Sequence, residues 1–121
     1  MRRSLRLSLA ATTAAASLAL AASLQAAPAI TTLNGTVGPG FVITLTKGGK
    51  KVTSLKAGKY KLVVKDLSSA HNFHLTGPGV NKSTGISKTG TTTWTLTFKK
   101  GTYRFVCIPH STSMKGSFKV T

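Results

Sequence analysis

Residues 103–114 read YRFVCIPHSTSM, and this stretch joins the end of a predicted β-strand to three side chains that bind soft metals. Large apolar residues stand at alternate positions up to Cys107, which is the period of a strand with one buried face. Cys107, His110 and Met114 follow in the pattern C-x2-H-x3-M. A strand would deliver Cys107 at its end, and a tight loop would return His110 and Met114 to the same point.

The donor atoms of this loop are those of a copper site. A thiolate, imidazoles and a weak axial thioether hold copper ions that cycle between Cu(I) and Cu(II). The chain has one cysteine, three histidines and, besides Met1, one methionine. Each of these residues alone would usually be ordinary packing or a satisfied polar group. Their convergence at this spacing predicts one bound copper per chain.

The second imidazole has to come from His71 or His74, in the segment AHNFH at 70–74. We expect a strand over 70–76, in which residues three apart point to opposite faces and lie about 10 Å apart. One metal ion could therefore use only one of these two histidines. The residues alone leave open which one it is.

The rest of the chain beyond about residue 30 shows the same alternation, broken by turns rich in glycine, proline and asparagine. Apolar residues alternate with lysines at 58–66 and with threonines at 92–98. Seven or eight short strands at this spacing predict an all-β Greek-key β-sandwich. The expected strands are 31–37, 41–46, 58–66, 70–76, 92–98, the stretch that ends at Cys107, and 115–121.

Residues 1–26 have the composition of a secretory signal peptide: a positive start, an apolar stretch and small residues up to Ala26. Cleavage after Ala26 is expected, because cleavage after Ala27 would place Pro28 directly behind the cut bond. An uncleaved membrane anchor is the alternative, but the stretch is short and weakly apolar beside the roughly 20 residues that span a bilayer. Both the general secretory route and the twin-arginine route stay open. Residues 27–121 are expected to form one copper-binding domain, located in the periplasm or elsewhere in the cell envelope.

The charge of the chain is strongly positive. The 17 basic residues include Arg2, Arg3 and Arg6 of the predicted leader, which leaves 14 in the domain against one acid, Asp66, and a net charge near +13. Such a domain favours anionic partners, so we expect an acidic redox protein, with an anionic envelope surface as an alternative. All but one of the 14 are lysines and the chain is expected to be exported, so nucleic-acid binding is not expected. We expect a monomer.

The segments AHNFH and YRFVCIPH resemble the paired metal-binding segments of the cupredoxins, the blue copper proteins that include plastocyanin, amicyanin and pseudoazurin. The resemblance spans about residues 31–121, and it implies that His74 does not bind the metal. It implies one type 1 copper held by His71, Cys107, His110 and Met114.

The same resemblance gives roles to residues near the ligands. Asn72 would tie the two ligand loops together, and His110 would form the edge through which electrons pass. Pro109 has no N–H and cannot donate a hydrogen bond to the Cys107 sulfur, which would stabilise the reduced site less. Residues 77–80 would form an uncharged surface near His110.

A site filled by four protein ligands leaves no open position for a substrate, so the sequence predicts a carrier of single electrons and not an enzyme. The alternative is an envelope protein that carries or stores copper with the same ligands. Such proteins often have open sites rich in methionine or histidine, which this chain lacks. A cupredoxin-shaped module without metal would be expected to lose at least one ligand.

Overall fold

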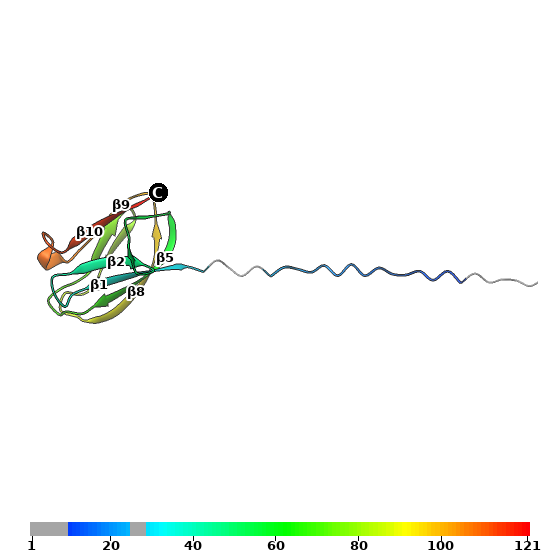
Figure 1. The fold of residues 1–121 in the computed structure, drawn as a ribbon, viewed down its shortest axis with the longest axis horizontal. Coiled ribbons are helices and arrows are strands. Elements are labelled where there is room, and N and C mark those ends of the chain that lie inside the picture. The colour runs from blue at the N-terminus through cyan, green and yellow to red at the C-terminus, as the bar shows by residue number, and fades with distance from the viewer. Residues whose placement is uncertain (1–9, 25–28) are drawn as a thin grey trace, which may run out of the picture.

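The structure is a computed structural model that describes residues 10–24 and 29–121. Residues 10–24 lie outside the folded domain as an exposed segment without helix or strand (Figure 1). The predicted cleavage point after Ala26 lies outside the described residues. No helix among the described residues has the length and apolar character needed to span a bilayer.

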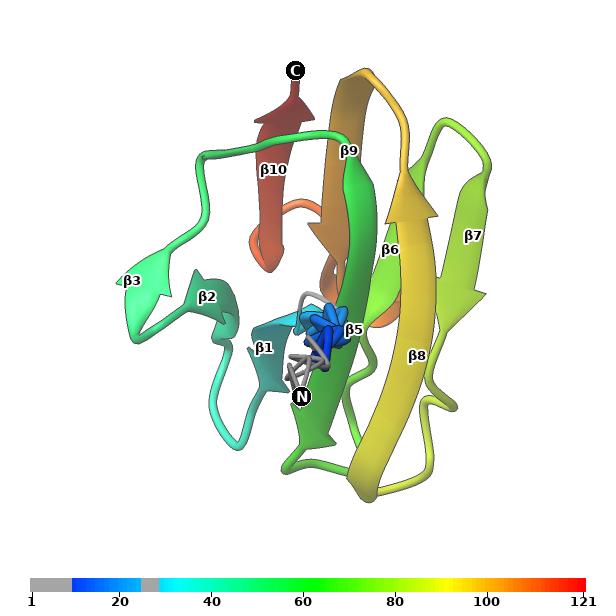
Figure 2. The same cartoon turned by 90° about the vertical axis from the view of Figure 1, so that its right-hand side faces the viewer.

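Two sheets pack face to face, with strand orders β3-β2-β1-β5-β8 and β4-β10-β9-β6-β7. β1 pairs with β5 and β4 with β10 in parallel, and the other pairs are antiparallel. Figure 2 shows β5 and β8 as long neighbouring strands. The predicted all-β sandwich is confirmed. The elements are β1 Thr31–Val37, β2 Ile43–Lys47, β3 Lys50–Lys51, β4 Ser54–Leu55, β5 Gly58–Asp66, β6 His74–Gly77, β7 Val80–Ser83, β8 Gly90–Phe98, β9 Gly101–Val106, the 3-10 turn η1 Ile108–His110, and β10 Lys115–Val120.

The alternation in the sequence becomes the two faces of each strand. Leu62 and Val64 of β5 are buried between the sheets, whereas the lysines beside them are exposed. Tyr103 stacks on Phe118 at a ring-centroid distance of 5.3 Å, and Phe98 meets Tyr103 edge-on at 4.8 Å. These rings form the centre of the core.

Close packing also explains a glycine in β10. A side chain at Gly116 would overlap the ring of Phe105, which lies against the backbone of the neighbouring strand. The backbone of β10 can approach this ring only because position 116 has no Cβ.

The prediction of a strand over 70–76 was wrong in its first half. β6 begins at His74, and residues 70–73 form a loop. The backbone of this loop bonds side chains in place of a strand: the Phe73 N–H donates to the Thr84 hydroxyl at 2.8 Å. β7 was not predicted, and β2 begins two residues later than expected.

The strand directions place four loops at one end of the sandwich. β1, β5, β7 and β9 end there, and β2, β6, β8 and β10 begin there. The loops are 38–42, 67–73, 84–89 and 107–114. Figure 1 shows η1, in orange, at this end, opposite the point where the chain enters β1.

Candidate metal centre

Three ligand atoms meet between the loops at this end of the sandwich. The Cys107 Sγ lies 3.6 Å from the Nδ1 of His71 and 3.6 Å from the Nδ1 of His110, and the two nitrogens lie 3.1 Å apart. A triangle with these sides has its centre about 2 Å from each corner, close to the roughly 2.0–2.3 Å bonds that a metal such as zinc forms with imidazole and thiolate. The three residues therefore fit a single metal ion of the kind predicted.

The loop after β9 closes on itself through its backbone. The Cys107 N–H donates to the Met114 carbonyl at 3.0 Å, and the Met114 N–H donates to the His110 carbonyl at 2.8 Å. These bonds hold Met114 next to both other residues, and its side chain is buried. Pro109 lies in η1, on the exposed side of the loop.

Asn72 connects this loop to the upstream one. Its Oδ1 accepts the Ile108 N–H at 2.8 Å, and its backbone N–H points to the Cys107 Sγ at 3.5 Å. Its Nδ2 donates to the Ser83 hydroxyl at 3.1 Å and to the Thr84 carbonyl at 3.3 Å. Asn72 is fully buried, and its side-chain bonds join three of the four loops.

The structure separates the two candidate histidines. His71 lies in the loop and is buried, with its Nδ1 in the cluster. His74 is the first residue of β6, and its Nε2 pairs with the Asn81 Oδ1 at 2.8 Å, outside the cluster. As expected, only one of these two histidines lies in the cluster. The reason differs from the expected one: β6 begins at His74, so no strand runs through both residues.

The uncharged surface expected at 77–80 is not near the centre. Pro78 packs beside Gly101, and Gly79 lies near Lys99, at the opposite end of the sandwich. This prediction was wrong because β6 runs away from the metal centre, so the turn that follows it lies at the far end.

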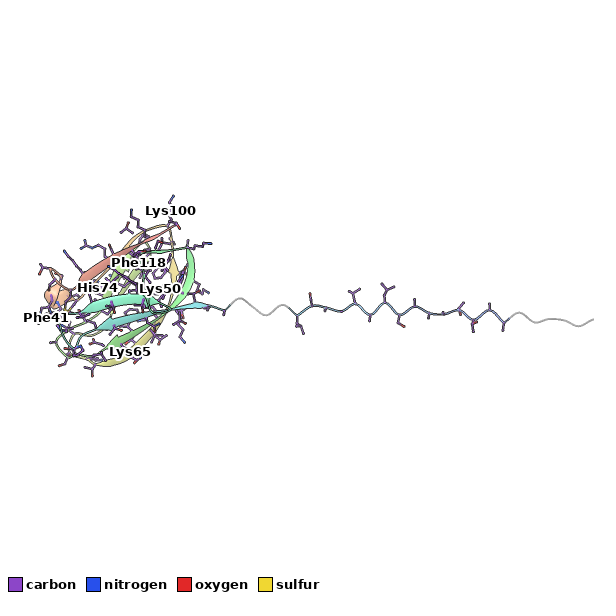
Figure 3. The ribbon with its side chains drawn as sticks, in the orientation of Figure 1. Phe41, Lys50, Lys65, His74, Lys100 and Phe118 are labelled. Carbon is purple, nitrogen blue, oxygen red and sulfur yellow. The ribbon has the colours of Figure 1, made fainter. Side chains whose placement is uncertain are left out.

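Exposed apolar side chains lie in the four loops at this end of the sandwich, and they were not predicted from the sequence. The Phe41 ring meets both imidazoles edge-on, with centroid distances of 5.3 Å to His71 and 4.9 Å to His110, and it remains 69% exposed. Figure 3 shows Phe41 at the tip of the molecule, beside η1. We call this surface the apolar rim; it consists of Phe41, Val42, Leu67, Ile86 and Ile108.

The sequence contained a signal for part of the apolar rim. Residues 41–43 are apolar in succession, and a half-buried strand cannot direct three successive side chains to one face. At least one of the three therefore had to lie outside the strand or face the solvent.

Asp66, the last residue of β5, is buried close to the centre, with 3% of its surface exposed. Its Oδ1 accepts the Ser68 N–H at 3.1 Å, whereas its Oδ2 has no hydrogen-bond partner among the described residues. Burial raises the pKa of this carboxyl, and the Ser68 N–H, the electrostatic influence of His71 and the Thr84 hydroxyl, which lies near but outside hydrogen-bond distance, oppose that rise. In the sequence, Asp66 is distinguished only as the one acid of the chain.

Comparisons with known proteins agree with this geometry. The model of the family described as "Copper binding proteins, plastocyanin/azurin family" matches residues 43–121. A methionine-to-glutamine variant of rusticyanin is 25% identical, with a TM-score of 0.55 over 74% of this chain and 76% of that one. Rusticyanin from Thiobacillus ferrooxidans is also 25% identical, with a TM-score of 0.52 and the same coverage.

A third structure extends the likeness of fold. Reduced auracyanin from Roseiflexus castenholzii is 22% identical, with a TM-score of 0.54 over 78% of this chain and 99% of that one. None of the curated proteins compared matches the chain.

Proposed function

Because the chain belongs to the plastocyanin/azurin family of copper-binding proteins, the cupredoxins, we propose that it is an exported carrier of single electrons. The family and the cluster of His71, Cys107 and His110 support one type 1 copper site, and hence a blue-copper electron-transfer protein. The convergence of the thiolate and the two Nδ1 atoms carries this proposal. We assign the fourth ligand to Met114.

Copper bound there supplies a one-electron couple between Cu(II) and Cu(I). Asn72 holds the two ligand loops through the Ile108 N–H and directs its own backbone N–H to the Cys107 sulfur. Because Pro109 has no N–H, it adds no second donor to that sulfur. The bonds of Asn72 link the two ligand loops through protein atoms alone.

We propose that electrons enter and leave through His110. His71 and Cys107 are buried, whereas His110 is half-buried and lies in the loop that faces the solvent. The Phe41 ring lies against His110, so a partner that covers the apolar rim would come close to this imidazole and exclude water from it.

The proposal includes no catalysis. The three residues of the centre are the one group of this kind that could hold a metal ion in the described part of the chain, and Met114 completes a set of four ligands. Such a set leaves no open position for a substrate.

An acidic redox protein is the proposed partner. The apolar rim carries no charge, so attraction has to come from lysines around it, with Lys82, Lys88 and Lys115 as the candidates nearest in sequence. All three are exposed. Lys88 lies in the 84–89 loop and Lys115 follows Met114, whereas Lys100 lies at the other end of the domain (Figure 3). We propose a monomer located outside the cytoplasm, in the periplasm or cell envelope, without nucleic-acid binding.

A copper carrier or store in the cell envelope is the alternative. It is favoured by one observation: the half-exposed His110 could be reached by a ligand of an accepting protein. The loop bonds of Asn72 favour electron transfer, because they oppose the separation of the ligand loops that release of the metal would require.

The experiment compares two rates on the purified copper form. An electron carrier is expected to develop an intense visible band with one equivalent of Cu(II), to lose and regain it on reduction and oxidation, and to exchange electrons much faster than it loses Cu(I) to a chelator. A copper carrier would release Cu(I) at least as fast as it exchanges electrons. Cys107→Ser is the control and should lack the band; a band that survives in this variant would disprove the assignment of the site.

A further inference from the structure

The chain has one acidic side chain, and the fold buries it beside the metal centre. Asp66 is 3% exposed, although an isolated acid on so basic a protein could lie on the surface among the lysines. It ends β5, where its neighbours in the sheet are Val37 and Gly90, and it precedes His71 by five residues. The carboxylate therefore lies at the end of the sandwich that carries the metal site.

One carboxylate oxygen has a structural role that needs no charge. The Asp66 Oδ1 accepts the Ser68 N–H at 3.1 Å and so forms the turn that leads to His71, whose own N–H points to the Ser68 carbonyl at 3.4 Å. An asparagine amide oxygen can form the same turn. The negative charge is what an asparagine would not supply.

The other oxygen has no hydrogen-bond partner among the described residues. A buried carboxylate oxygen without a partner destabilises the folded protein. Such groups are uncommon in native structures, and one that is present often has a functional role. Ser68 links this carboxylate to His71, a proposed ligand, because its N–H donates to the Asp66 Oδ1 and its carbonyl faces the His71 N–H. The charge of the carboxylate therefore lies close to the metal centre.

We propose that Asp66 tunes the reduction potential of the centre: its buried negative charge stabilises the oxidised form and lowers the potential. This inference rests on the proposed function. One electron from a reduced partner lowers the charge of the centre by one unit, whereas the ionised Asp66 carboxylate carries the same charge in both redox states. A negative charge nearby therefore stabilises the oxidised form more than the reduced one.

Burial makes this single charge effective against the many positive ones. The lysines are exposed, so water and salt screen their effect on the centre. Asp66 lies inside the protein, where charges interact more strongly and salt screens them little. One buried carboxylate can thus offset part of the effect of a strongly basic surface.

The test is the potential of Asp66→Asn, which keeps the shape and the turn and removes the charge. We expect a higher potential, with at least a threefold fall in the ratio of oxidised to reduced protein at a fixed solution potential. This equals about 28 mV, since a tenfold change corresponds to about 59 mV for one electron. The shift should persist as the salt concentration rises.

Lys65→Gln is the matched control. Lys65 precedes Asp66 in β5 and is exposed on the outer face. The variant therefore also removes one charge, but this charge is positive and lies in contact with water. The potential should fall in this variant, by less, and the difference should disappear at high salt.

A second readout uses the unfolding of metal-free and Cu(II)-loaded protein in urea. Without metal, Asp66→Asn should be at least as stable as the wild type, because burying a neutral amide costs less than burying a charged carboxylate. Cu(II) should then stabilise the variant less than it stabilises the wild type.

An unchanged or lower potential in folded, copper-loaded Asp66→Asn would overturn the proposal. If that variant does not fold, Asp66→Ser, which keeps an acceptor for the Ser68 N–H, decides by the same criterion. Failure of both to fold would also overturn it, since the carboxylate would then be required by the fold. Failure of the proposed function is seen separately, as a wild-type protein without a reversible visible band.

Discussion

Asn72 and Ile108 join the two ligand loops through one short hydrogen bond, from the Ile108 N–H to the Asn72 Oδ1 at 2.8 Å. Ile108 directly follows Cys107, and Asn72 directly follows His71, so the bond links the neighbours of two proposed ligands. The positions of the Cys107 and His71 side chains are thereby coupled through the backbone.

Replacement of Asn72 by alanine should destabilise the metal-free protein. The Ile108 N–H would lose its partner inside the protein, at a cost of about 1–3 kcal/mol. Urea unfolding measures this difference. Ser83→Ala is the control. It removes one hydrogen-bond acceptor of the Asn72 amide, but Ser83 is exposed, so the loss of stability should be smaller. Equal stabilities for wild type and Asn72→Ala would show that the bond does not hold the loops.

His71→Ala and His74→Ala should differ completely in copper binding. The Nδ1 of His71 lies in the cluster, whereas the ring of His74 pairs with Asn81 outside it. Titration with Cu(II), followed by visible absorption, should give no intense band in the first variant and a nearly unchanged band in the second. The opposite result would move the upstream ligand to His74.

Met114→Gln should keep the copper and lower the reduction potential. The amide oxygen of glutamine is a harder donor than a thioether and favours Cu(II). The side chain at this position is buried, and the loop backbone holds it next to Cys107 and His110. Voltammetry checks the prediction. A potential identical to that of the wild type would mean that Met114 is not a ligand.

The rate of electron transfer should depend on salt in opposite ways for two kinds of partner. The positive field of the domain attracts an acidic redox protein and repels a basic one, and salt screens both effects over about 10 Å at 0.1 M. Stopped-flow measurements over a series of salt concentrations should show the rate falling with the acidic partner and rising with the basic one. If the rate does not depend on salt with either partner, the lysines do not steer electron transfer, and they only keep the surface solvated or bind an anionic envelope.

The alternation of apolar and polar residues was sufficient to predict the strands that direct every second side chain into the core. β1 and β5 were predicted with the bounds that the structure has, because each directs every second side chain inward over many residues. Cys107 and His110 could be placed together because only Ile108 and Pro109 lie between them, which is about one turn of the chain.

Features that depend on distant parts of the chain could not be predicted. The loop at 70–73 leaves the strand pattern because the Thr84 hydroxyl and the Cys107 sulfur accept its N–H groups, and neither is near in sequence. Phe41 reaches the imidazoles from the β1–β2 loop, which shares no motif with the ligand segments.

The burial of Asp66 has a further consequence, for the behaviour of the domain in acid. Proteins commonly unfold at low pH because carboxylates with lowered pKa values must take up protons. Here burial raises the pKa of the one side-chain carboxyl above the ordinary value of an aspartate, so the sign of the effect is reversed. A carboxyl of this kind contributes stability that is fully present below its unfolded pKa and is lost as the pH rises through its folded pKa.

Metal-free wild type should therefore gain stability relative to Asp66→Asn as the pH falls towards 3.8, and urea unfolding at several pH values measures the difference. A difference in stability that does not change with pH would show that Asp66 has the same pKa in the folded and unfolded states. The lysines and Arg104 keep their charges throughout this range. The domain thus has no side-chain carboxylate with a lowered pKa whose protonation would unfold it in acid.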